Sequence, residues 1–413
     1  MGLLPPTSRD LSAVLGSVQS MRLLHTSDWH LGRGLHGVDL HEAQEAVLAQ
    51  VVTTAAVEEV DAVLISGDIF DRAVPPVASV RLWSRVLGEL SALTPVIVIP
   101  GNHDSATRLG VGADLYRDGV HIVSEVSSVG TPVVLRDDHG PVAVYPVPFL
   151  DPDMSRRALA DGDEIPARSH EAVLTAAMGR VRDDLEGRRR SDLATRSVVM
   201  AHAFVVSGAA VDAVRSDSER DIRVGGVESV ASSVFDGVDY VALGHLHGSQ
   251  RVDGERIRYS GSPLRYSFSE VHQAKQVLIV DLDAGGLSAV RSLPLEQPRP
   301  MASIEGLLHD VLSSSQLGAH VDSWVQVTVT DSARPPDLQA RVRERFPNAL
   351  VIRHVPASGP LVERGTGSTQ VPAQPSEVAE AFVHYVTGGD ITPEELAVFE
   401  AAYEHVLAEG RSA

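Results

Sequence analysis

Short apolar runs that alternate with longer helical patterns are the feature that most restricts the fold of this chain. Leu23–Thr26, Ala62–Ser66 and Val96–Ile99 are aliphatic, and each ends in a polar or glycine-rich turn, as buried strands do. Between them, Leu40–Val60 and Val77–Leu90 have helical periodicity. The alternation predicts a layered α/β fold with helices packed on two sheets or on one large mixed sheet.

The same alternation continues to about residue 295 and then changes. Five further strands and one helix are expected before that point, at 142–147, 197–200, 240–243, 256–260 and 277–281, and at 169–185. The proline-rich stretch Pro294–Pro300 marks a boundary. Beyond it, a strand at Val321–Val329, a helix at Pro336–Arg345 and a strand at Ala349–Arg353 predict a small α/β module within residues 301–356.

The two ends of the chain are expected to lie outside these folded parts. Residues 1–20 have a poor hydrophobic pattern and are interpreted as a disordered or non-native extension before a first domain at 21–295. Residues 357–374 are a linker by composition. Within 375–413, two amphipathic helices are expected at Glu377–Val386 and Pro393–Ala408, the second with Thr392 as its N-cap and Glu395 completing a capping box.

Composition limits the chemistry. The 413 residues include no cysteine, which excludes disulfides, thiolate metal sites and cysteine nucleophiles. No apolar run approaches the ~20 residues needed to span a bilayer, and the opening residues do not resemble a signal peptide. We therefore expect a cytoplasmic protein whose metal ligands, if any, are His, Asp, Glu or Asn.

Five short motifs place such ligands where a predicted strand runs into a loop. They are SDWH, SGDIFDR, PGNHDS, MAHAF and LGHLH, beginning at residues 27, 66, 100, 200 and 243. Because ligands of open α/β sheets bind at the carboxyl ends of strands, loops from neighbouring strands can converge on one point. The motifs offer seven donors: Asp28, His30, Asp68, Asn102, His202, His245 and His247.

Each motif alone has a simpler explanation. The aspartate of GD after a strand is common turn chemistry, and a histidine on an apolar strand is more often a core residue than a ligand. Five motifs, all at strand ends, are harder to explain without a metal site. Seven donors are too many for one ion and suit two, and mixed His and carboxylate ligands favour Mn, Fe or Zn over Ca.

Together these motifs resemble the calcineurin-like metallophosphoesterase superfamily. The strings RLLHTSDWHLGR (22–33), SGDIFDRAVPP (66–76) and YSGSPLRYSFSE (259–270) resemble SbcD-type nucleases within it, and the likeness covers roughly residues 21–410. It implies a layered metallophosphoesterase fold with a small α/β cap module and C-terminal helices. It also implies cleavage of DNA phosphodiester bonds, as an exonuclease or endonuclease, in replication, recombination and repair.

The resemblance implies a role for each donor. One ion, most often Mn²⁺ in this family, is held by Asp28, His30, Asp68 and His247, and the other by Asp68, Asn102, His202 and His245, with Asp68 as the bridge. The histidine of GNHD, His103, faces the scissile phosphate, a task that suits a side chain titrating near neutral pH. Asp71 resembles the partner that orients this histidine, and Arg72 is a candidate phosphate contact.

Net charge argues against tight DNA binding by the chain alone. The formal charge is −20, whereas DNA affinity comes mostly from Lys and Arg. The resemblance implies a partner that supplies the basic surface, an SbcC-type ATPase, in a heterotetramer containing two copies of this chain; DNA ends or hairpins are the implied substrate. Lys275 is the single lysine, so nearly all positive charge is arginine, a preference that we attribute to coding bias. Three arginines of the predicted helix, Arg341, Arg343 and Arg345, are either a solvated face or a contact to the DNA backbone.

Two other functions use the same residues. A phosphatase or nucleotide phosphodiesterase would keep the metal site and change the substrate, because fold and ligands do not determine substrate. The module beyond residue 300 favours a nuclease over a small-molecule phosphatase. A non-catalytic scaffold for an ATPase is disfavoured because all seven donors and His103 are present.

Overall fold

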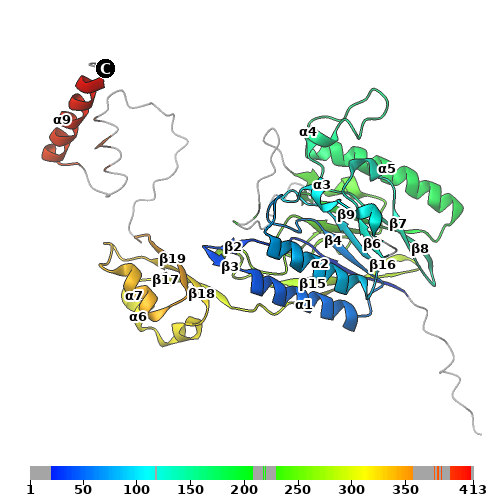
Figure 1. The fold of residues 1–413 in the computed structure, drawn as a ribbon, viewed down its shortest axis with the longest axis horizontal. Coiled ribbons are helices and arrows are strands. Elements are labelled where there is room, and N and C mark those ends of the chain that lie inside the picture. Colours follow the sequence, from blue (N-terminus) through cyan, green and yellow to red (C-terminus); the bar gives the residue numbers. More distant parts are fainter. Residues whose placement is uncertain are drawn as a thin grey trace, which may run out of the picture. The chain divides into compact units, whose positions relative to one another are not determined.

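The computed structural model describes residues 20–116, 119–207, 217, 219, 229–356, 376, 379–380, 383 and 391–410. The chain divides into two compact units, Met1–Ala302 and Ser303–Ala413 (Figure 1). Residues 1–19 of the extension expected at 1–20, the linker at 357–374 and most of the helix expected at 377–386 lie outside the described residues.

The first unit contains two six-stranded mixed sheets. The first sheet has the order β16-β15-β1-β4-β5-β6, in which β1, β4, β5 and β6 are parallel and β15 and β16 are antiparallel to their neighbours. Its strands are β1 (Met21–Thr26), β4 (Ala62–Ser66), β5 (Val96–Ile99), β6 (Val120–Ile122), β15 (Gln276–Asp283) and β16 (Gly286–Pro294). β1 therefore pairs on one side with a strand that comes about 250 residues later in the chain.

The second sheet has the order β13-β14-β12-β9-β8-β7, with β14, β12, β9 and β8 parallel. Its strands are β7 (Val133–Asp137), β8 (Gly140–Pro146), β9 (Arg196–His202), β12 (Tyr240–Gly244), β13 (Gln250–Asp253) and β14 (Ile257–Tyr259). The short strands of the unit are β2 (Gly34–Leu35), β3 (Val38–Asp39), β10 (Val205–Val206) and β11 (Val230–Ala231).

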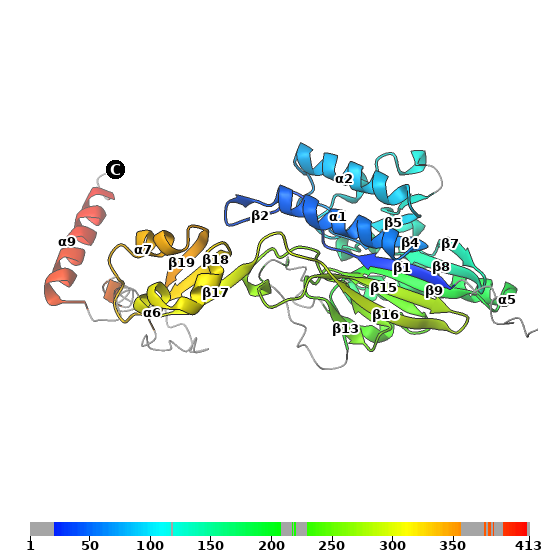
Figure 2. The same ribbon diagram turned by 90° about the horizontal axis from the view of Figure 1, so that it is seen from below.

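Helices cover the outer faces of both sheets. α1 (His41–Val57) and α2 (Val77–Ser91) lie together on the first sheet, and α5 (His170–Ser191) lies on the second (Figures 1 and 2). Ser169 caps α5, its side chain accepting a hydrogen bond from Ala172 N. Short helices complete the unit: α3 (Ala106–Leu109), α4 (Pro152–Ser155), η2 (Ala113–Leu115), η3 (Val126–Ser128), η4 (Ser232–Phe235) and η5 (Phe268–Glu270).

Alternation along the strands gives each sheet two buried faces. Leu24 and Val63 pack under α1 and α2, whereas Leu23 and Leu64 pack against Met200 of the other sheet. A third apolar cluster joins the second sheet to α5. The unit is therefore a four-layer α/β/β/α sandwich, and the expectation of a layered α/β fold with two sheets is confirmed.

The second unit is a smaller α/β module. Its three-stranded sheet has the order β17-β18-β19, with β17 (Met301–Gly306), β18 (Trp324–Val329) and β19 (Ala349–His354). Its helices are α6 (Leu308–Ser313), η6 (Ser315–His320), α7 (Leu338–Arg345) and, after the undescribed residues, α9 (Pro393–Gly410). On α7, Arg341 and Arg343 are exposed, whereas Arg345 donates to Ser314 O and stacks on Phe346.

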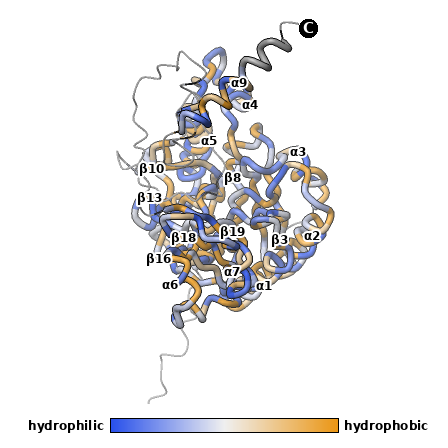
Figure 3. The backbone as a smooth tube through the Cα atoms, turned by 90° about the vertical axis from the view of Figure 1, so that its left-hand side faces the viewer, coloured by the Kyte–Doolittle hydropathy of each residue, from blue (hydrophilic) through white to orange (hydrophobic). Residues whose placement is uncertain are grey.

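The start of α9 has the expected capping box. Glu395 N donates to Thr392 Oγ1 at 3.3 Å, and Thr392 N donates to Glu395 Oε2 at 2.9 Å. None of the side chains of residues 391–403 is buried. Hydrophobic and hydrophilic residues interleave along the chain (Figure 3), and no described helix is long and apolar enough to cross a membrane.

Candidate metal centre

All seven predicted donors lie at or just after the carboxyl ends of five central parallel strands. From the first sheet, Asp28 and His30 follow β1, Asp68 follows β4 and Asn102 follows β5; from the second, His202 ends β9, and His245 and His247 follow β12. Because both sheets present this edge at one place, the donors gather between them. Six of the seven side chains belong to residues that are buried, and Asn102 is half-buried.

Four of the donors have a left-handed backbone. The φ angles are 56° at Asp28, 44° at His30, 52° at Asp68 and 110° at His245. Such angles cost on the order of 1 kcal/mol or more for residues other than glycine, and they persist where surrounding contacts hold them. Here Asp28 N donates to Gly67 O at 3.0 Å, and His245 N donates to Asp28 Oδ1 at 3.0 Å. The left-handed backbone at these four residues thus turns the loops so that the donor side chains face the site.

Close approach explains the glycines of two motifs. A Cβ on Gly67, whose φ is +90°, would overlap the ring of His202. A Cβ on Gly101 would overlap the carboxylate and backbone nitrogen of Asp68. Glycine before Asp68 and before Asn102 therefore lets three loops approach one another.

The ligand atoms lie within a few ångströms of one another. His30 Nε2 and His202 Nε2 are each 3.5 Å from Asp68 Oδ2, which places this carboxylate between the two imidazoles. His247 Nε2 is 3.0 Å from His30 Nε2, and His202 Nε2 is 2.9 Å from Asn102 Oδ1. Among the described residues, ligand atoms within 4.8 Å of one another form three groups, Asp28–His30–His247, Asp28–Asp68–His202 and His30–Asp71–His103. The His245 ring centroid is 5.5 Å from that of His202.

The His30–His247 contact fits a cation. Two imidazole Nε2 atoms 3.0 Å apart need a proton or a metal ion between them. Burial lowers the pKa of both rings, which disfavours an imidazolium here. In the neutral rings the N–H of one imidazole lies between the two Nε2 atoms, and a metal ion can take the place of that proton. The other nitrogen of His247 faces the Glu270 carboxylate at 3.0 Å, which leaves its Nε2 lone pair directed into the site. The donor set therefore suits a divalent ion.

Charges in the site are strongly coupled. Burial raises the pKa of Asp28 to about 8, and the nearby Asp68 adds to the shift. Burial also opposes ionisation of Asp68, but the imidazoles of His202, His30 and His103 outweigh it and hold its pKa well below the usual range. Burial lowers the pKa of His202, yet the Asp68 carboxylate raises it to about 9 overall. Without metal, the positive charge beside Asp68 thus comes from the proton on His202. A metal cation can take the place of that proton.

His103 lies beside the donors and is held by the backbone. Its amide donates to Asp68 Oδ1 at 2.9 Å, and its Nδ1 is 2.8 Å from the carbonyl oxygen of Asp71. Its Nε2 is buried and has no hydrogen-bond partner among the described residues. The Asp71 carboxylate instead lies 3.7 Å from His30 Nδ1 and 3.4 Å from Arg33 Nη1. Asp71 therefore contacts His103 through its main chain, which differs from the side-chain dyad expected from the resemblance.

Arg72 is less engaged than expected of a site residue. Its side chain is exposed and makes no hydrogen bond or ion pair with another described residue. Arg33, which sequence reasoning did not select, is 18% exposed and lies over the ring of Tyr266, 5.6 Å from its centroid. Its place in the SDWHLGR stretch, five residues after Asp28, was the available signal.

Asp104 of GNHDS is a second residue that the sequence interpretation missed. Its carboxylate accepts hydrogen bonds from Ile69 N at 3.0 Å, Phe70 N at 2.9 Å and Gly101 N at 2.9 Å. It therefore ties the loop that carries Asp68 to the loop that carries Asn102. An aspartate directly after a predicted ligand loop was the signal that could have indicated this role.

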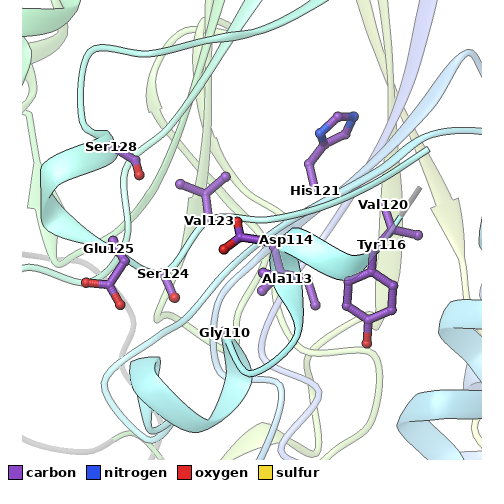
Figure 4. Close-up of a pocket in the computed structure, with 11 residues that line it drawn as sticks. Gly110, Ala113, Asp114, Tyr116, Val120, His121, Val123, Ser124, Glu125 and Ser128 are labelled. Carbon is purple, nitrogen blue, oxygen red and sulfur yellow. The ribbon is translucent and has the colours of Figure 1, made fainter. Parts of the chain in front are cut away.

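A separate pocket of about 430 Å³ lies beside α3, η2 and β6 (Figure 4). Asp114, His121, Ser124 and Glu125 are among the residues that line it. Neither His103 nor any of the seven donors lines this pocket. This pocket is therefore distinct from the metal centre.

Comparison with protein families agrees with the geometry of the site. The family model described as calcineurin-like phosphoesterase matches residues 21–249, more than half of the 413 residues. The chain belongs to the calcineurin-like phosphoesterase family. A second family model, SbcD_C, described as the type 5 capsule protein repressor C-terminal domain, matches residues 297–406. The protein is a metal-dependent phosphoesterase of the SbcD type, as the sequence motifs indicated.

Solved structures with some likeness to this chain include three proteins of low identity. TT1561 of Thermus thermophilus is 16% identical with a TM-score of 0.38, over 66% of this chain and 99% of that one. GAP50, the anchor in the inner membrane complex of Plasmodium, is 10% identical with a TM-score of 0.35, over 83% and 99%. A dimetal phosphatase from Danio rerio is 14% identical with a TM-score of 0.33, over 67% and 99%. TM-scores below 0.5 add nothing to the family assignment.

Proposed function

We propose that the protein is a dinuclear-metal DNA nuclease that acts with an SbcC-type ATPase. The observation that carries the proposal is the convergence of seven donors from two sheets beside His103, whose buried Nε2 has no hydrogen-bond partner in the described part of the chain. The C-terminal part of the chain matches the SbcD_C family. In this proposal residues 21–295 are the nuclease domain and residues 301–356 a module that contacts DNA.

Two ions would share the donors through Asp68. Asp28, His30, Asp68 and His247 would hold one, and Asp68, Asn102, His202 and His245 the other; the contacts of Asp68 with both His30 and His202 support its role as bridge. Nitrogen and oxygen donors without thiolate, together with the SbcD resemblance, favour Mn²⁺. When bound, such a pair of ions supplies the charge neutralisation and the activated water for in-line attack on a phosphodiester.

The chain's own residues would handle the leaving group. With Nδ1 bonded to the Asp71 carbonyl, His103 can present only Nε2 to the substrate. A protonated Nε2 would donate to the departing oxygen. Arg33 adds a positive charge close to the metal ligands and is a candidate contact for phosphate in place of the exposed Arg72.

The proposed partner compensates for the charge of the chain. A net charge of −20 predicts weak DNA affinity at physiological salt, so an ATPase with a basic surface would bring the DNA. The exposed apolar residues of α9, among them Val398 at 71% and Tyr403 at 40%, support docking of this helix on a partner helix. Such a complex would act on DNA ends in the cytoplasm, at the nucleoid.

The test is digestion of end-labelled duplex and hairpin DNA with Mn²⁺, with and without the candidate ATPase. Asp68→Asn should abolish cleavage and weaken the binding of both ions. Asp153→Asn, which removes one partner of the exposed ion pair with Arg168, is the control, and this variant should cleave DNA normally. Parallel assays with bis(p-nitrophenyl) phosphate and p-nitrophenyl phosphate distinguish a diesterase from a monoesterase. Near-normal cutting by Asp68→Asn, or hydrolysis of the monoester alone, would contradict the proposal.

A further inference from the structure

The string YSGSPLRYSFSE, residues 259–270, lies directly behind the metal donors. Ser260 Oγ is 2.8 Å from Ser27 Oγ, which in turn donates to Asp28 Oδ2 at 2.5 Å. The Tyr266 hydroxyl donates to Trp29 O, and its ring lies edge-on to that of His30, 5.6 Å between centroids. This segment contributes no predicted donor, yet it contacts the loops that carry the donors.

Glu270, at the end of this string, is fully buried against His247. Its Oε1 is 3.0 Å from His247 Nδ1. Its Oε2 is 2.6 Å from Lys275 Nζ and accepts a hydrogen bond from Tyr266 N at 3.2 Å. The carboxylate is therefore a hydrogen-bond acceptor toward three groups, and only one of them is a predicted metal ligand.

Lys275, the single lysine of the chain, is the buried partner of this carboxylate. It is 3% exposed. Besides Glu270, its Nζ donates to His247 O at 2.9 Å, to Ser262 Oγ at 2.8 Å and to Gln273 Oε1 at 2.8 Å. The ammonium group of the single lysine is thus surrounded by four acceptors next to the metal centre.

A buried ion pair of this kind needs a reason beyond stability. Taking two charges out of water costs several kcal/mol per ion, and apolar replacements of such pairs are often neutral or stabilising. The geometry offers that reason, because a carboxylate behind a ligating imidazole fixes which ring nitrogen carries the proton.

We propose that Glu270 is a positioning residue that keeps the proton of His247 on Nδ1 and its Nε2 lone pair facing the metal, and that Lys275 compensates the buried charge of Glu270. The inference rests on the proposed dinuclear function and names residues outside the seven donors. It concerns the ion held by Asp28, His30, Asp68 and His247, not the other one.

Glu270→Gln makes the inference testable because an amide has one acceptor and one donor. Lys275 Nζ and Tyr266 N both donate toward the Oε2 position, so they will select the amide oxygen there. The amide NH₂ will then face His247 Nδ1, which must accept, and the ring proton moves to Nε2. In Lys275→Met the carboxylate remains and continues to accept from His247 Nδ1.

The first measurement is a calorimetric titration of the full-length metal-free protein with Mn²⁺. The second is the ¹⁵N chemical shifts of the imidazoles, recorded on the metal-free protein, which report the tautomer of His247. Glu270→Gln should bind one of two ions roughly 10- to 100-fold more weakly and shift His247 to the Nε2–H form. Lys275→Met should change either affinity less than about threefold. Asp137→Asn is the matched control, because Asp137 and Arg196 form another buried pair, each side chain 3% exposed, that contacts no metal donor.

Thermal unfolding separates positioning from folding. All three single variants leave a buried charge unpaired and should unfold at lower temperature. The double variant Glu270→Gln with Lys275→Met leaves no buried unpaired charge at this place, so its melting temperature should recover. Its affinity for the ion should stay low, because Tyr266 N still orients the amide. Normal binding of both ions by Glu270→Gln, or equal losses in Glu270→Gln and Lys275→Met, would overturn the inference. A wild-type protein that binds fewer than two ions would instead contradict the proposed function.

Discussion

At the scale of single residues, different atoms of His103 serve two purposes: its main chain and Nδ1 fix the ring in place, and its Nε2 is left for the substrate. Its main chain and Nδ1 are both engaged, by Asp68 Oδ1 and the Asp71 carbonyl, and its Nε2 is buried without a partner among the described residues. An unpartnered buried nitrogen costs free energy in the resting protein, which is consistent with a role that begins when substrate arrives.

His103→Ala should therefore lose activity and keep metal. We expect cleavage to fall roughly 10²- to 10⁴-fold, the usual contribution of a general acid or base. Because seven other side chains supply the donors, two ions should still bind, as measured by metal analysis after gel filtration. Stoichiometric loss of metal from His103→Ala would show that it is a ligand.

Asp71→Asn should be far milder than His103→Ala. The hydrogen bond to His103 comes from the Asp71 carbonyl, which the substitution retains. The substitution removes the negative charge 3.4 Å from Arg33 Nη1. We expect kcat/KM to fall less than about tenfold, mainly through a higher KM and not a lower kcat. A loss as large as that of His103→Ala would restore the side-chain dyad implied by the resemblance.

At the scale of elements, the ends of the central strands could be predicted from the sequence, whereas the edge strands and the Glu270 contact behind the ligands could not. β1, β4, β5, β9 and β12 are buried apolar runs that stop at a ligand motif, so pattern alone located all five ends. The edge strands β6, β7, β13 and β16 were not predicted, and β16 has only one buried residue among nine. Glu270 was missed because its pairing with His247 depends on tertiary contact across 23 residues.

The ion pair between β7 and β9 predicts how the first unit responds to acid. Arg196 binds Asp137 through two hydrogen bonds, of 2.9 and 2.5 Å. Burial alone would raise the pKa of Asp137, but Arg196 lowers it below the unfolded value of about 3.9. A lowered folded pKa means that the pair stabilises the protein above pH ~4 and that this contribution is lost as pH falls through the folded pKa.

Urea unfolding of the wild type and Asp137→Asn between pH ~2.5 and ~7 would measure this contribution. We expect Asp137→Asn to lower the free energy of unfolding by about 3 kcal/mol near neutral pH, because Arg196 is left buried and unpaired. The difference should shrink below pH ~4. A difference that is independent of pH would mean that the charge of Asp137 contributes nothing.

The first turns of α9 have local stabilising contacts. Its capping box satisfies two of the free amides of the first turn, and Phe399 stacks on Tyr403 one turn later, 6.2 Å between ring centroids. Deleting residues 375–413 should leave the metal content and the melting temperature of the first unit unchanged and abolish co-purification with the ATPase. Normal stoichiometry of the truncated complex would place the docking surface elsewhere.

At the scale of the whole molecule, the metal centre depends on strands that lie beyond the matched family region. That region ends at residue 249, whereas β14, β15 and β16 follow it and complete both sheets. A chain cut after Ser249 should therefore aggregate or give a broad thermal transition without metal binding. A chain cut after Ala302, where the first unit ends, should unfold cooperatively and hold two ions; cooperative folding of the shorter chain would contradict this dependence.

The place of β15 beside β1 also has a consequence for synthesis on the ribosome. Roughly 260 residues separate the end of β1 from the end of β15, so at ~5–20 residues per second the edge of β1 waits roughly 13 to 50 seconds for its partner. During that interval an apolar strand with free amide and carbonyl groups is open to pairing with other nascent chains. Soluble yield should therefore rise when a chaperone that binds nascent chains is supplied in excess, because it occupies the exposed edge until β15 emerges.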